Sequence, residues 1–240
     1  MPVIKKSLES KCIIIIQARM GSIRFPGKSF FPFKRKPALK HILNSVLQTA
    51  KRENIFVATS ERKENLPIVQ LCANLKINVF QGDENNVASR FFYIAKQTKA
   101  NFFIRINGDS PLFDYRGIEQ GIKILKQKKY NVDLITTMNG GYPSGMNMEI
   151  MNIKTFNEFY PKFKEQGDFE HVTKYFKDKS YKFNIFFMKS NIKNPDMYKF
   201  SFDDKEDCKR IIKLFSAMKK QHYQYTLEEK CEMYKKLFLK

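Results

Sequence analysis

The sequence is poor in the residues that build disulfide frameworks and zinc sites. Its 240 residues include only three histidines and four cysteines. Cys12, Cys72, Cys208 and Cys231 lie far apart and lack the paired spacing of a metal site. We therefore expect buried free thiols in a reducing cytoplasm.

Long apolar stretches are also missing. Residues 1–11 contain no apolar run long enough for a signal peptide, and the apolar residues 13–16 are too few to cross a bilayer. The sequence therefore predicts a cytoplasmic protein that has no membrane partner.

Acidic residues are in short supply, because 24 Asp and Glu face 44 Lys and Arg, which gives a formal net charge of +20. Such an excess is common in nucleic-acid-binding proteins. The basic residues are mostly scattered lysines, and the one tight block is the short run Lys34-Arg35-Lys36. A binding face should cluster its charge, so composition explains most of the excess and we predict no nucleic-acid partner. Anionic substrates are still favoured by the field.

Apolar runs alternate with amphipathic stretches through the first half. This alternation predicts right-handed βαβ units and a mostly parallel sheet with helices on both faces, a Rossmann-like α/β three-layer sandwich. Ligands of such sheets bind outside the carboxyl ends of the strands, here the loops after residues 16, 80 and 106. The expected strands are 12–18, 55–59, 79–80, 102–106 and 132–136, and the expected helices are 37–52, 68–75, 87–96 and 118–125.

The second half is less regular. No internal repeat or long linker appears, so we predict one domain over residues 1–240 with an inserted subregion near residues 139–195. The expected strands are 146–151, 181–188 and 198–202, and the expected helices are 206–219 and 227–239.

The loop after the first strand carries the strongest chemical signal. Residues 17–28 contain Arg19, Arg24 and Lys28 together with two glycines, and cations beside free backbone N–H groups suit a triphosphate. A P-loop has four residues between its first glycine and Gly-Lys-Ser/Thr, but five residues separate the two glycines here. No Gly-x-Gly-x-x-Gly occurs either. The remaining alternative is a basic surface loop.

Two acidic segments follow predicted strands. Asp109 lies in Asn-Gly-Asp-Ser-Pro-Leu, and Asp203 opens Asp-Asp-Lys-Glu-Asp. Mg²⁺ prefers a few carboxylates together with phosphate oxygens, which suits Asp109. Each segment also has a purely structural interpretation, a turn for the first and a helix cap for the second.

Together these segments resemble the sugar cytidylyltransferases, and most closely the type that acts in spore coat polysaccharide biosynthesis. The family signature Gln-Ala-Arg-Met-Gly-Ser-x-Arg-Leu-Pro-Gly-Lys matches residues 17–28 except at Phe25. The family pattern Arg-Ile-Thr-Gly-Asp-Cys-Pro-Leu matches residues 105–112 except at Asn107 and Ser110. Relatives in this group make CMP-sialic acid and CMP-3-deoxy-manno-octulosonate.

The resemblance implies a fold of the nucleotide-diphospho-sugar transferase type. It also implies that CMP passes from CTP to an acidic sugar, with Mg²⁺ held by Asp109 and Asp203. The Asp203 assignment rests on the family pattern Val-Asp-Thr-Pro-Glu-Asp, in which Asp204 here replaces Thr. Arg19, Lys28 and Asp109 are the expected catalytic residues. The expected nucleotide contacts are Ala18, Arg19, Gly21, Ser22, Arg24, Lys28 and Arg90.

Two further regions resemble family segments that face the base and the acceptor. Residues 81–91 resemble the segment beside the base and ribose, although Arg90 could instead lie on a solvated helix face. A lone histidine is more often structural than functional, so the role of His171 stays open. Relatives pair through their second half, and a homodimer is therefore expected. The expected acceptor contacts are Gly145, Glu149, Glu170 and His171.

Two other classes of protein remain as alternatives. A metal-dependent glycosyltransferase shares this type of sheet, but its usual Asp-x-Asp is not found after the fourth strand. A basic nucleic-acid-binding protein would show steeply salt-dependent binding, and it leaves the first loop and the Gly-Asp segment unexplained.

Overall fold

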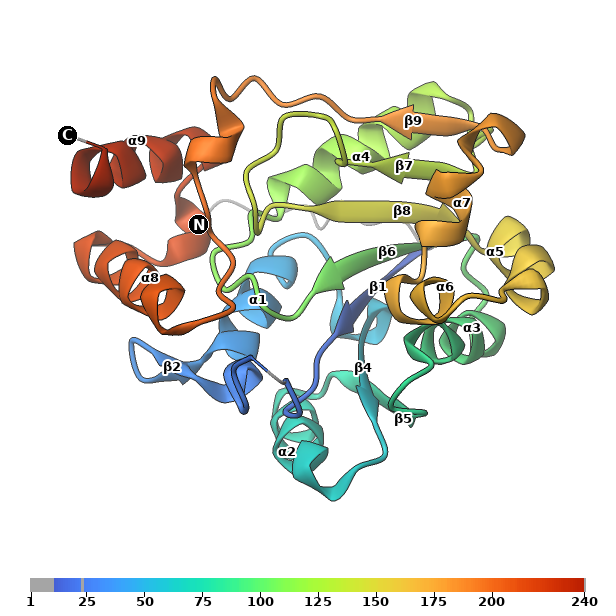
Figure 1. The fold of residues 1–240 in the computed structure, drawn as a ribbon, viewed down its shortest axis with the longest axis horizontal. Coiled ribbons are helices and arrows are strands. Elements are labelled where there is room, and N and C mark those ends of the chain that lie inside the picture. Colours follow the sequence, from blue (N-terminus) through green and yellow to red (C-terminus); the bar gives the residue numbers. More distant parts are fainter. Residues whose placement is uncertain (1–10, 23, 240) are drawn as a thin grey trace.

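A seven-stranded sheet forms the centre of the computed structural model, which describes residues 11–22 and 24–239 (Figure 1). The strand order is β5-β4-β1-β6-β8-β7-β9. Neighbouring strands are parallel except β8, which runs antiparallel to β6 and β7. The strands are β1 (Cys12–Gln17), β4 (Ile55–Ser60), β5 (Asn78–Gly82), β6 (Phe102–Asn107), β7 (Leu134–Thr136), β8 (Met148–Asn152) and β9 (Ile185–Phe187).

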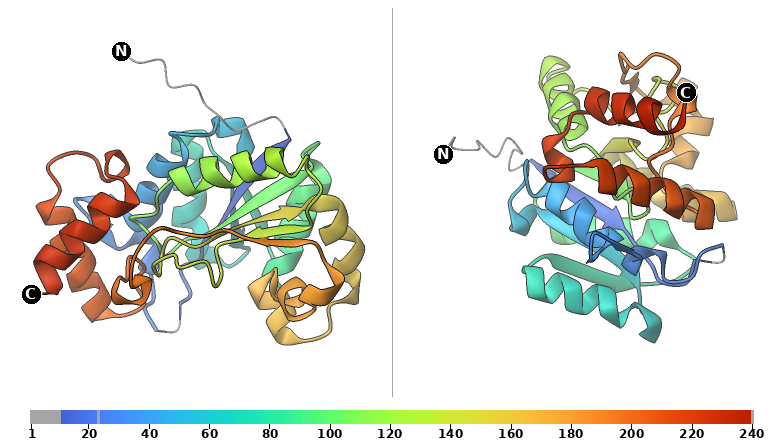
Figure 2. Two further views of the ribbon diagram at one scale, coloured as in Figure 1. Left: turned by 90° about the horizontal axis from the view of Figure 1, so that it is seen from above. Right: turned by 90° about the vertical axis from the view of Figure 1, so that its left-hand side faces the viewer.

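Helices cover both faces of this sheet, as the continuous apolar run of β1 requires. Ile14 and Ile16 pack with α1, α2 and α4 on one face, whereas Ile13 and Ile15 pack with α3, α5 and α7 on the other. The left view of Figure 2 shows α4 on the side of the sheet opposite the gold helices. The predicted three-layer α/β fold is confirmed. The helices are α1 (Ala38–Val46), α2 (Leu66–Leu75), α3 (Val87–Gln97), α4 (Arg116–Gln127), α5 (Ile153–Phe159), α6 (Gln166–His171) and α7 (Lys174–Asp178).

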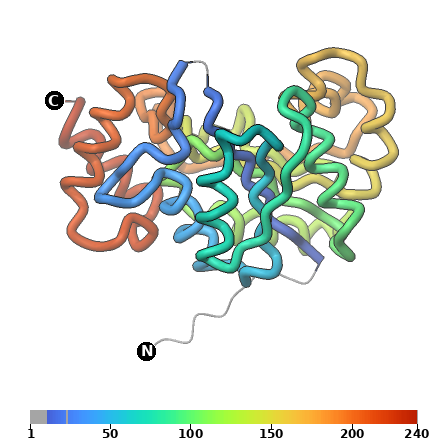
Figure 3. Tube along the Cα trace, turned by 90° about the horizontal axis from the view of Figure 1, so that it is seen from below, coloured from blue at the N-terminus to red at the C-terminus, as the bar shows by residue number. Residues whose placement is uncertain are grey.

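A third apolar cluster closes one end of the molecule. It joins the hairpin of β2 (Pro32–Phe33) and β3 (Lys36–Pro37) to α8 (Lys205–Ala217) and α9 (Leu227–Phe238). Figure 3 shows this red end and the gold segment of α5–α7 at opposite ends of the molecule. The loops of the candidate site described below lie between these two ends.

The prediction of a strand over residues 198–202 is wrong. The segment is extended but forms a single bridge, between Ser144 and Lys199. Its alternating pattern arises because Tyr198, Phe200 and Phe202 are buried in the third apolar cluster. Burial on one side of an extended chain produces the same period of two as a strand.

Other differences concern the lengths of elements. The predicted strand 181–188 shrinks to Ile185–Phe187, because Ser180–Lys182 forms a 3-10 turn before it. The first helix ends at Val46, six residues earlier than predicted. The segment 139–195 contributes β8 and β9 to the central sheet, so it is woven into the same fold.

All four cysteines are buried and free, as expected. Over residues 11–22 and 24–239, none of the helices has both the length and the apolar character needed to cross a membrane.

Candidate active site

The candidate site lies where the parallel strands β1, β4, β5 and β6 end at one edge of the sheet (Figure 1). A cavity of about 460 Å³ opens there between the loops after β1 and β6 and the start of α3. Position at the carboxyl edge agrees with the general rule for α/β sheets. Predicted site residues that line this cavity are Ala18, Arg19, Ser22, Arg24, Lys28, Arg90, Asp109, Glu170 and His171.

The loop after β1 is closed by its own hydrogen bonds. The Met20 carbonyl accepts from the N–H groups of Ser22 and Gly27, at 2.9 and 2.8 Å. Gly27 has a φ of 75°, a left-handed conformation that favours glycine. Ser29 Oγ donates to the Arg19 carbonyl at 2.9 Å, which ties the end of the loop to its beginning. The backbone therefore holds the cationic side chains over the cavity.

Lys28 joins the two acidic segments that the sequence singles out. Its Nζ lies 3.2 Å from Asp109 Oδ2 and 3.3 Å from Asp203 Oδ1. Arg24 Nη2 is 3.1 Å from the same Asp203 oxygen. The fold thus brings together two carboxylates 94 positions apart in the chain around one ammonium group.

The acidic residues of the second segment have different roles: one caps α8 and another faces Lys28. Asp204 is the N-cap of α8, and its Oδ1 accepts from the Asp207 N–H at 2.8 Å. Asp207 Oδ2 accepts from the Asp203 N–H at 2.9 Å. Burial raises the pKa of Asp207, but hydrogen bonds from Lys199 and Arg210 outweigh burial and lower it overall. Asp203 is therefore the acid of this segment whose side chain faces Lys28.

A close backbone approach places Asp109. A Cβ on Gly108 would lie 2.5 Å from the Gln17 carbonyl oxygen, so only glycine lets the end of β6 lie against the end of β1. Asp109 Oδ1 accepts from Ser110 Oγ at 3.1 Å. Asp109 Oδ2 is left for the lysine described above.

Arg90 supports the loop after β5 from below. Its Nε and Nη2 donate to the carbonyls of Asp83 and Glu84, at 2.8 and 2.9 Å, and the residue is 1% exposed. Burial lowers the pKa of this arginine, while Glu84 opposes the shift. Glu84 Oε1 in turn holds Arg19 Nη1 at 3.0 Å. The prediction that Arg90 lies at the cavity fits this placement better than a solvated helix face.

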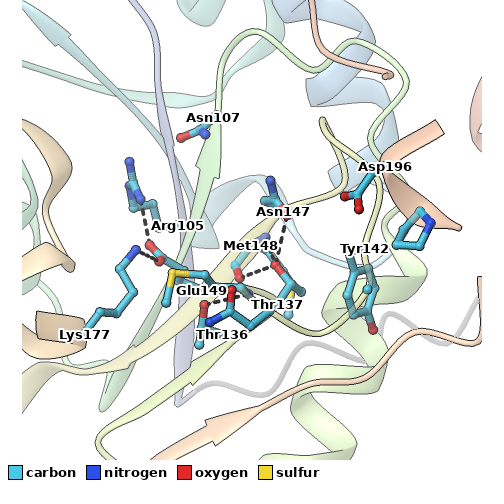
Figure 4. A pocket seen from close by; sticks show the side chains of 14 residues that line it. Arg105, Asn107, Thr136, Thr137, Tyr142, Asn147, Met148, Glu149, Lys177 and Asp196 are labelled. Carbon is cyan, nitrogen blue, oxygen red and sulfur yellow. Dashed lines mark hydrogen bonds and ion pairs between the residues drawn. The ribbon is translucent and has the colours of Figure 1, made fainter. Parts of the chain in front are cut away.

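A second cavity of about 400 Å³ adjoins the first and shares Arg105 and Asn107 with it (Figure 4). Glu149 lies at its base with both carboxylate oxygens engaged. Its Oε2 is 2.7 Å from Arg105 Nη1 and 2.6 Å from Thr173 Oγ1, and its Oε1 is 2.8 Å from Lys177 Nζ. Burial alone would raise the pKa of Glu149, but Arg105 and Lys177 lower it to about 2.

The four expected acceptor contacts do not gather in one place. Glu149 lines the second cavity, whereas Glu170 and His171 line the first. Gly145 has a φ of 88°, and a Cβ there would lie 2.4 Å from the Ser201 backbone nitrogen. Its backbone geometry thus serves the packing of residues 144–146 against 200–201. Gly21 faces the Glu64 carboxylate. The roles of all these residues stay predictions.

Residues 13–239 match the family model described as cytidylyltransferase. The chain belongs to this family. It is therefore an enzyme of the nucleotidyltransferase class, and the two alternative classes raised above are set aside.

The chain is also similar to several individual proteins. The uncharacterized protein MJ1063 of Methanocaldococcus jannaschii is 33% identical over 178 residues, 74% of this chain and 72% of that protein. The spore coat polysaccharide biosynthesis protein SpsF of Bacillus subtilis is 27% identical over 210 residues, 85% of each chain. The 3-deoxy-manno-octulosonate cytidylyltransferase of Escherichia coli is 28% identical over 110 residues, 46% of this chain and 44% of that enzyme. A cytidylyltransferase structure from Leptospira borgpetersenii superposes with a TM-score of 0.89 at 24% identity, over 95% of this chain and 94% of that one, which shows a shared fold.

Some residues at the site of this cytidylyltransferase escaped sequence reasoning. Arg105 and Asn107 connect the two cavities, and Lys177 holds Glu149 from α7. Arg105 and Asn107 stand in the same short motif as Asp109, so their position at a strand end was a usable signal. The contact of Lys177 with Glu149 joins residues 28 positions apart, and no local pattern predicts it.

Proposed function

We propose that this cytidylyltransferase transfers CMP from CTP to a hydroxyl group of an acidic sugar used in surface-polysaccharide biosynthesis. A bond forms between the sugar oxygen and the α-phosphorus, the bond to the β-phosphate breaks, and pyrophosphate leaves. The names of two relatives, a spore coat polysaccharide protein and a 3-deoxy-manno-octulosonate cytidylyltransferase, support this choice of substrates.

The observation that carries the proposal is the pair of adjoining cavities. The first is lined by Arg19, Arg24 and Lys28, which suits a triphosphate. The second is polar and meets the first at Arg105 and Asn107. A triphosphate in one cavity and a sugar in the other would bring the α-phosphate and a hydroxyl group together at this junction. Holding both groups in line is the main contribution that a protein makes to such a transfer.

The cations of the first loop would neutralise the triphosphate and the leaving pyrophosphate. Lys28 is the cation that we expect to neutralise the developing charge, because it already lies beside two carboxylates at the cavity wall. Arg19 is held in place by Glu84, so its guanidinium is oriented before the substrate arrives. Fixed charges of this kind stabilise a transition state without reorganisation during the reaction.

The donor set suits Mg²⁺. Asp109 Oδ2 and Asp203 Oδ1 approach one ammonium group, which shows that both carboxylates face the same cationic position. Mg²⁺ commonly takes one or two carboxylates and completes its shell with water and substrate phosphates. Asp109 and Asp203 would hold the ion. When bound, it would supply a divalent charge that screens the phosphate oxygens and favours departure of pyrophosphate.

The second cavity has a positive end that would suit the sugar carboxylate. Arg105 and Lys177 bring two positive charges against the single negative charge of Glu149. Asp196 lines the opposite side of the cavity (Figure 4). The sugar carboxylate would therefore lie toward Arg105 and Lys177, with neutral hydroxyl groups near Asn147 and Thr137.

A cytoplasmic homodimer is also part of the proposal. The edge strand β9 leaves Phe187 38% exposed, and Tyr181 in the 3-10 turn that precedes β9 in the chain is 80% exposed. Exposed aromatic side chains next to an unpaired strand edge favour association. Light scattering after gel filtration should give twice the chain mass of 28.4 kDa, and a mass of one chain would remove the dimer from the proposal.

Release of pyrophosphate tests the reaction directly. Each of the four nucleoside triphosphates is incubated with Mg²⁺, the enzyme and a panel of acidic sugars. We expect release with CTP and with at least one sugar. Release with another triphosphate alone would overturn the choice of CTP. Failure of every triphosphate to shift the unfolding temperature would overturn the assignment of the first cavity.

A further inference from the structure

A third cavity, of about 260 Å³, lies at the end of the molecule formed by the β2–β3 hairpin and the end of α8. Among the described residues, none that lines this cavity also lines either of the two above. Its wall includes four lysines and two histidines, with no acidic side chain among the described lining residues. They are Lys34, Lys36, Lys219, Lys220, His41 and His222.

The lysines of this wall differ in how they are engaged. Lys34 Nζ donates to the Met218 carbonyl at 2.7 Å. Lys220 Nζ lies 3.5 Å from Glu229 Oε1. Within the described part of the chain, the ammonium groups of Lys36 and Lys219 have no side-chain partner. Lys34, Lys219 and Lys220 are exposed and Lys36 is half-buried, so the wall gathers positive charge with no carboxylate among its described lining residues.

Two buried imidazoles add unmet hydrogen-bonding capacity. His41 Nε2 donates to the Phe33 carbonyl at 2.7 Å, which leaves its buried Nδ1 without a partner among the described residues. His222 Nε2 is likewise buried and unpartnered there, and the two residues are 3% and 2% exposed. Burial lowers the pKa of both, to about 2 for His222. In the neutral imidazoles these nitrogens carry lone pairs and accept hydrogen bonds, so they suit a hydroxyl group of a bound molecule and not its phosphate oxygens.

The hairpin turn that carries two of these cations is itself unusual. Lys34 and Arg35 have φ angles of 43° and 62°, although neither is a glycine or an asparagine. Two-residue hairpin turns of this shape normally use Asn-Gly. Conformations of this kind persist where the surrounding structure enforces them, and they cluster at binding sites. The one tight basic block of the sequence is thus placed at the rim of a cavity.

We propose that this cavity binds the phosphate group of a small phosphorylated molecule, away from the nucleotide site. Lys36 and Lys219 donate hydrogen bonds to the phosphate oxygens, and Lys34 and Lys220 contribute charge. A phosphate group with two negative charges neutralises four ammonium groups better than a carboxylate group with one negative charge does. The size of the cavity admits a phosphate group with a small organic part.

Histidine NMR tests this site, because the chain has three histidines. His41 and His222 line the proposed site and His171 lines the nucleotide cavity. The intact enzyme with isotope-labelled histidine is titrated with inorganic phosphate, and a His171→Asn variant assigns the third signal. We expect saturable shifts of the His41 and His222 signals. A parallel titration with glycerol 3-phosphate shows whether a phosphate ester binds more tightly than free phosphate.

The matched variants are Lys36→Gln with Lys219→Gln, and Lys99→Gln with Lys123→Gln as a control with the same change of charge at exposed positions. The first pair should weaken phosphate binding by about tenfold or more, because two charge-assisted hydrogen bonds are lost. The control pair should bind as the wild type does. Shifts confined to His171, no saturable shift at His41 and His222, or unchanged binding in the first pair would each overturn the proposal.

Discussion

Lys28 has an unusual position, because it contacts a carboxylate from each of two distant segments. Its side chain is 17% exposed, and those of Asp109 and Asp203 are 24% and 22% exposed. Removing one acid leaves the lysine paired with the other, so its ammonium group keeps a carboxylate partner in either single variant. Single substitutions here should therefore change chemistry more than folding.

The first prediction concerns Asp109. Replacement by Asn keeps the shape of the side chain and removes the charge proposed to hold the metal. Turnover should fall about a hundredfold or more, because electrostatic groups at the reacting phosphate contribute on this scale. The unfolding temperature should change little. The control is Asp178→Asn, whose carboxylate is 51% exposed on α7 and should leave turnover intact. Near-normal turnover of Asp109→Asn would remove this residue from the site.

The second prediction separates two adjacent acids. Asp203→Ala should abolish most turnover and leave stability nearly unchanged, because Asp203 faces Lys28. Asp204→Ala should retain turnover and lower the free energy of unfolding by about 1 kcal/mol, because a helix N-cap is lost. Denaturant unfolding and steady-state kinetics measure both. The reverse pattern would mean that Asp204 is the acid at the metal position.

The sequence groups the cationic residues, and the structure places them at one cavity, whereas the expected acceptor residues lie at different places and their roles stay predictions. Arg19, Arg24 and Lys28 belong to one short loop. Residues so close in sequence stay close together in space in any fold, and here they line one cavity. Glu149 and His171 come from different elements, and only the tertiary structure decides which cavity each one meets. Residue type and local spacing are therefore enough to group the residues of the first loop, but not to group the candidate acceptor residues.

At the scale of elements, the strands of the first half and the long helices were predictable, whereas the short helices and two strands of the second half were not. The central strand β1 is an unbroken apolar run, and α1 and α4 show clear helical periodicity. α5, α6 and α7 have seven, six and five residues. Two turns or fewer are too short for a period of 3.6 to appear, so tertiary packing rather than local pattern defines them.

A third prediction follows from the way Glu149 on β8 links β6 to α7. Glu149→Gln would leave Arg105 and Lys177 facing a neutral amide in a buried place, so stability should fall by about 3 kcal/mol. The pKa of Glu149 is lowered to about 2, so its contribution is present above the ordinary value of 4.5. The contribution is lost as the pH falls from 4.5 toward 2.

Urea unfolding from pH 7 down to acid measures this link. The wild type should lose its advantage over Glu149→Gln as the pH drops. The control, Glu158→Gln, alters an exposed carboxylate on α5 and should match the wild type throughout. An equal stability of Glu149→Gln and wild type at pH 7 would contradict the assigned role.

The fourth prediction concerns Lys230, through which α9 meets Asp114, two residues before the start of α4. Lys230 is fully buried, its Nζ lies 3.9 Å from Asp114 Oδ2, and burial lowers its pKa to about 8 despite that carboxylate. Between pH 8 and the ordinary 10.5 the unfolded chain binds more protons at this site. This site therefore adds stability as the pH rises, by at most about 1.4 kcal/mol per unit.

Lys230→Met isolates this contribution, because Asp114 keeps its partner Arg116 at 2.9 Å. The variant should be at least as stable as the wild type at pH 7, since an apolar side chain of similar length replaces a buried charge. The difference between them should shift in favour of the wild type from pH 8 to 10.5. A constant difference over that range would show that burial does not lower the pKa of Lys230.

At the scale of the whole molecule, the charge of +20 creates a field that attracts anionic substrates. The fifth prediction is that the KM for CTP rises with ionic strength, by about threefold to tenfold between 0.05 and 0.3 M salt, because screening shortens the Debye length. Turnover at saturating CTP should change much less. A KM that is independent of salt would mean that local contacts alone recruit the nucleotide.

The central claim is the transfer of CMP, and the fate of two radioactive labels tests it most directly. The enzyme is incubated with Mg²⁺, an acidic sugar that supports pyrophosphate release, and CTP labelled at either the α- or the γ-phosphate. We predict that the α-label appears in a sugar nucleotide and that the γ-label appears in pyrophosphate. Transfer of the γ-label to the sugar, or release of the α-label as free CMP without a sugar nucleotide, would contradict it.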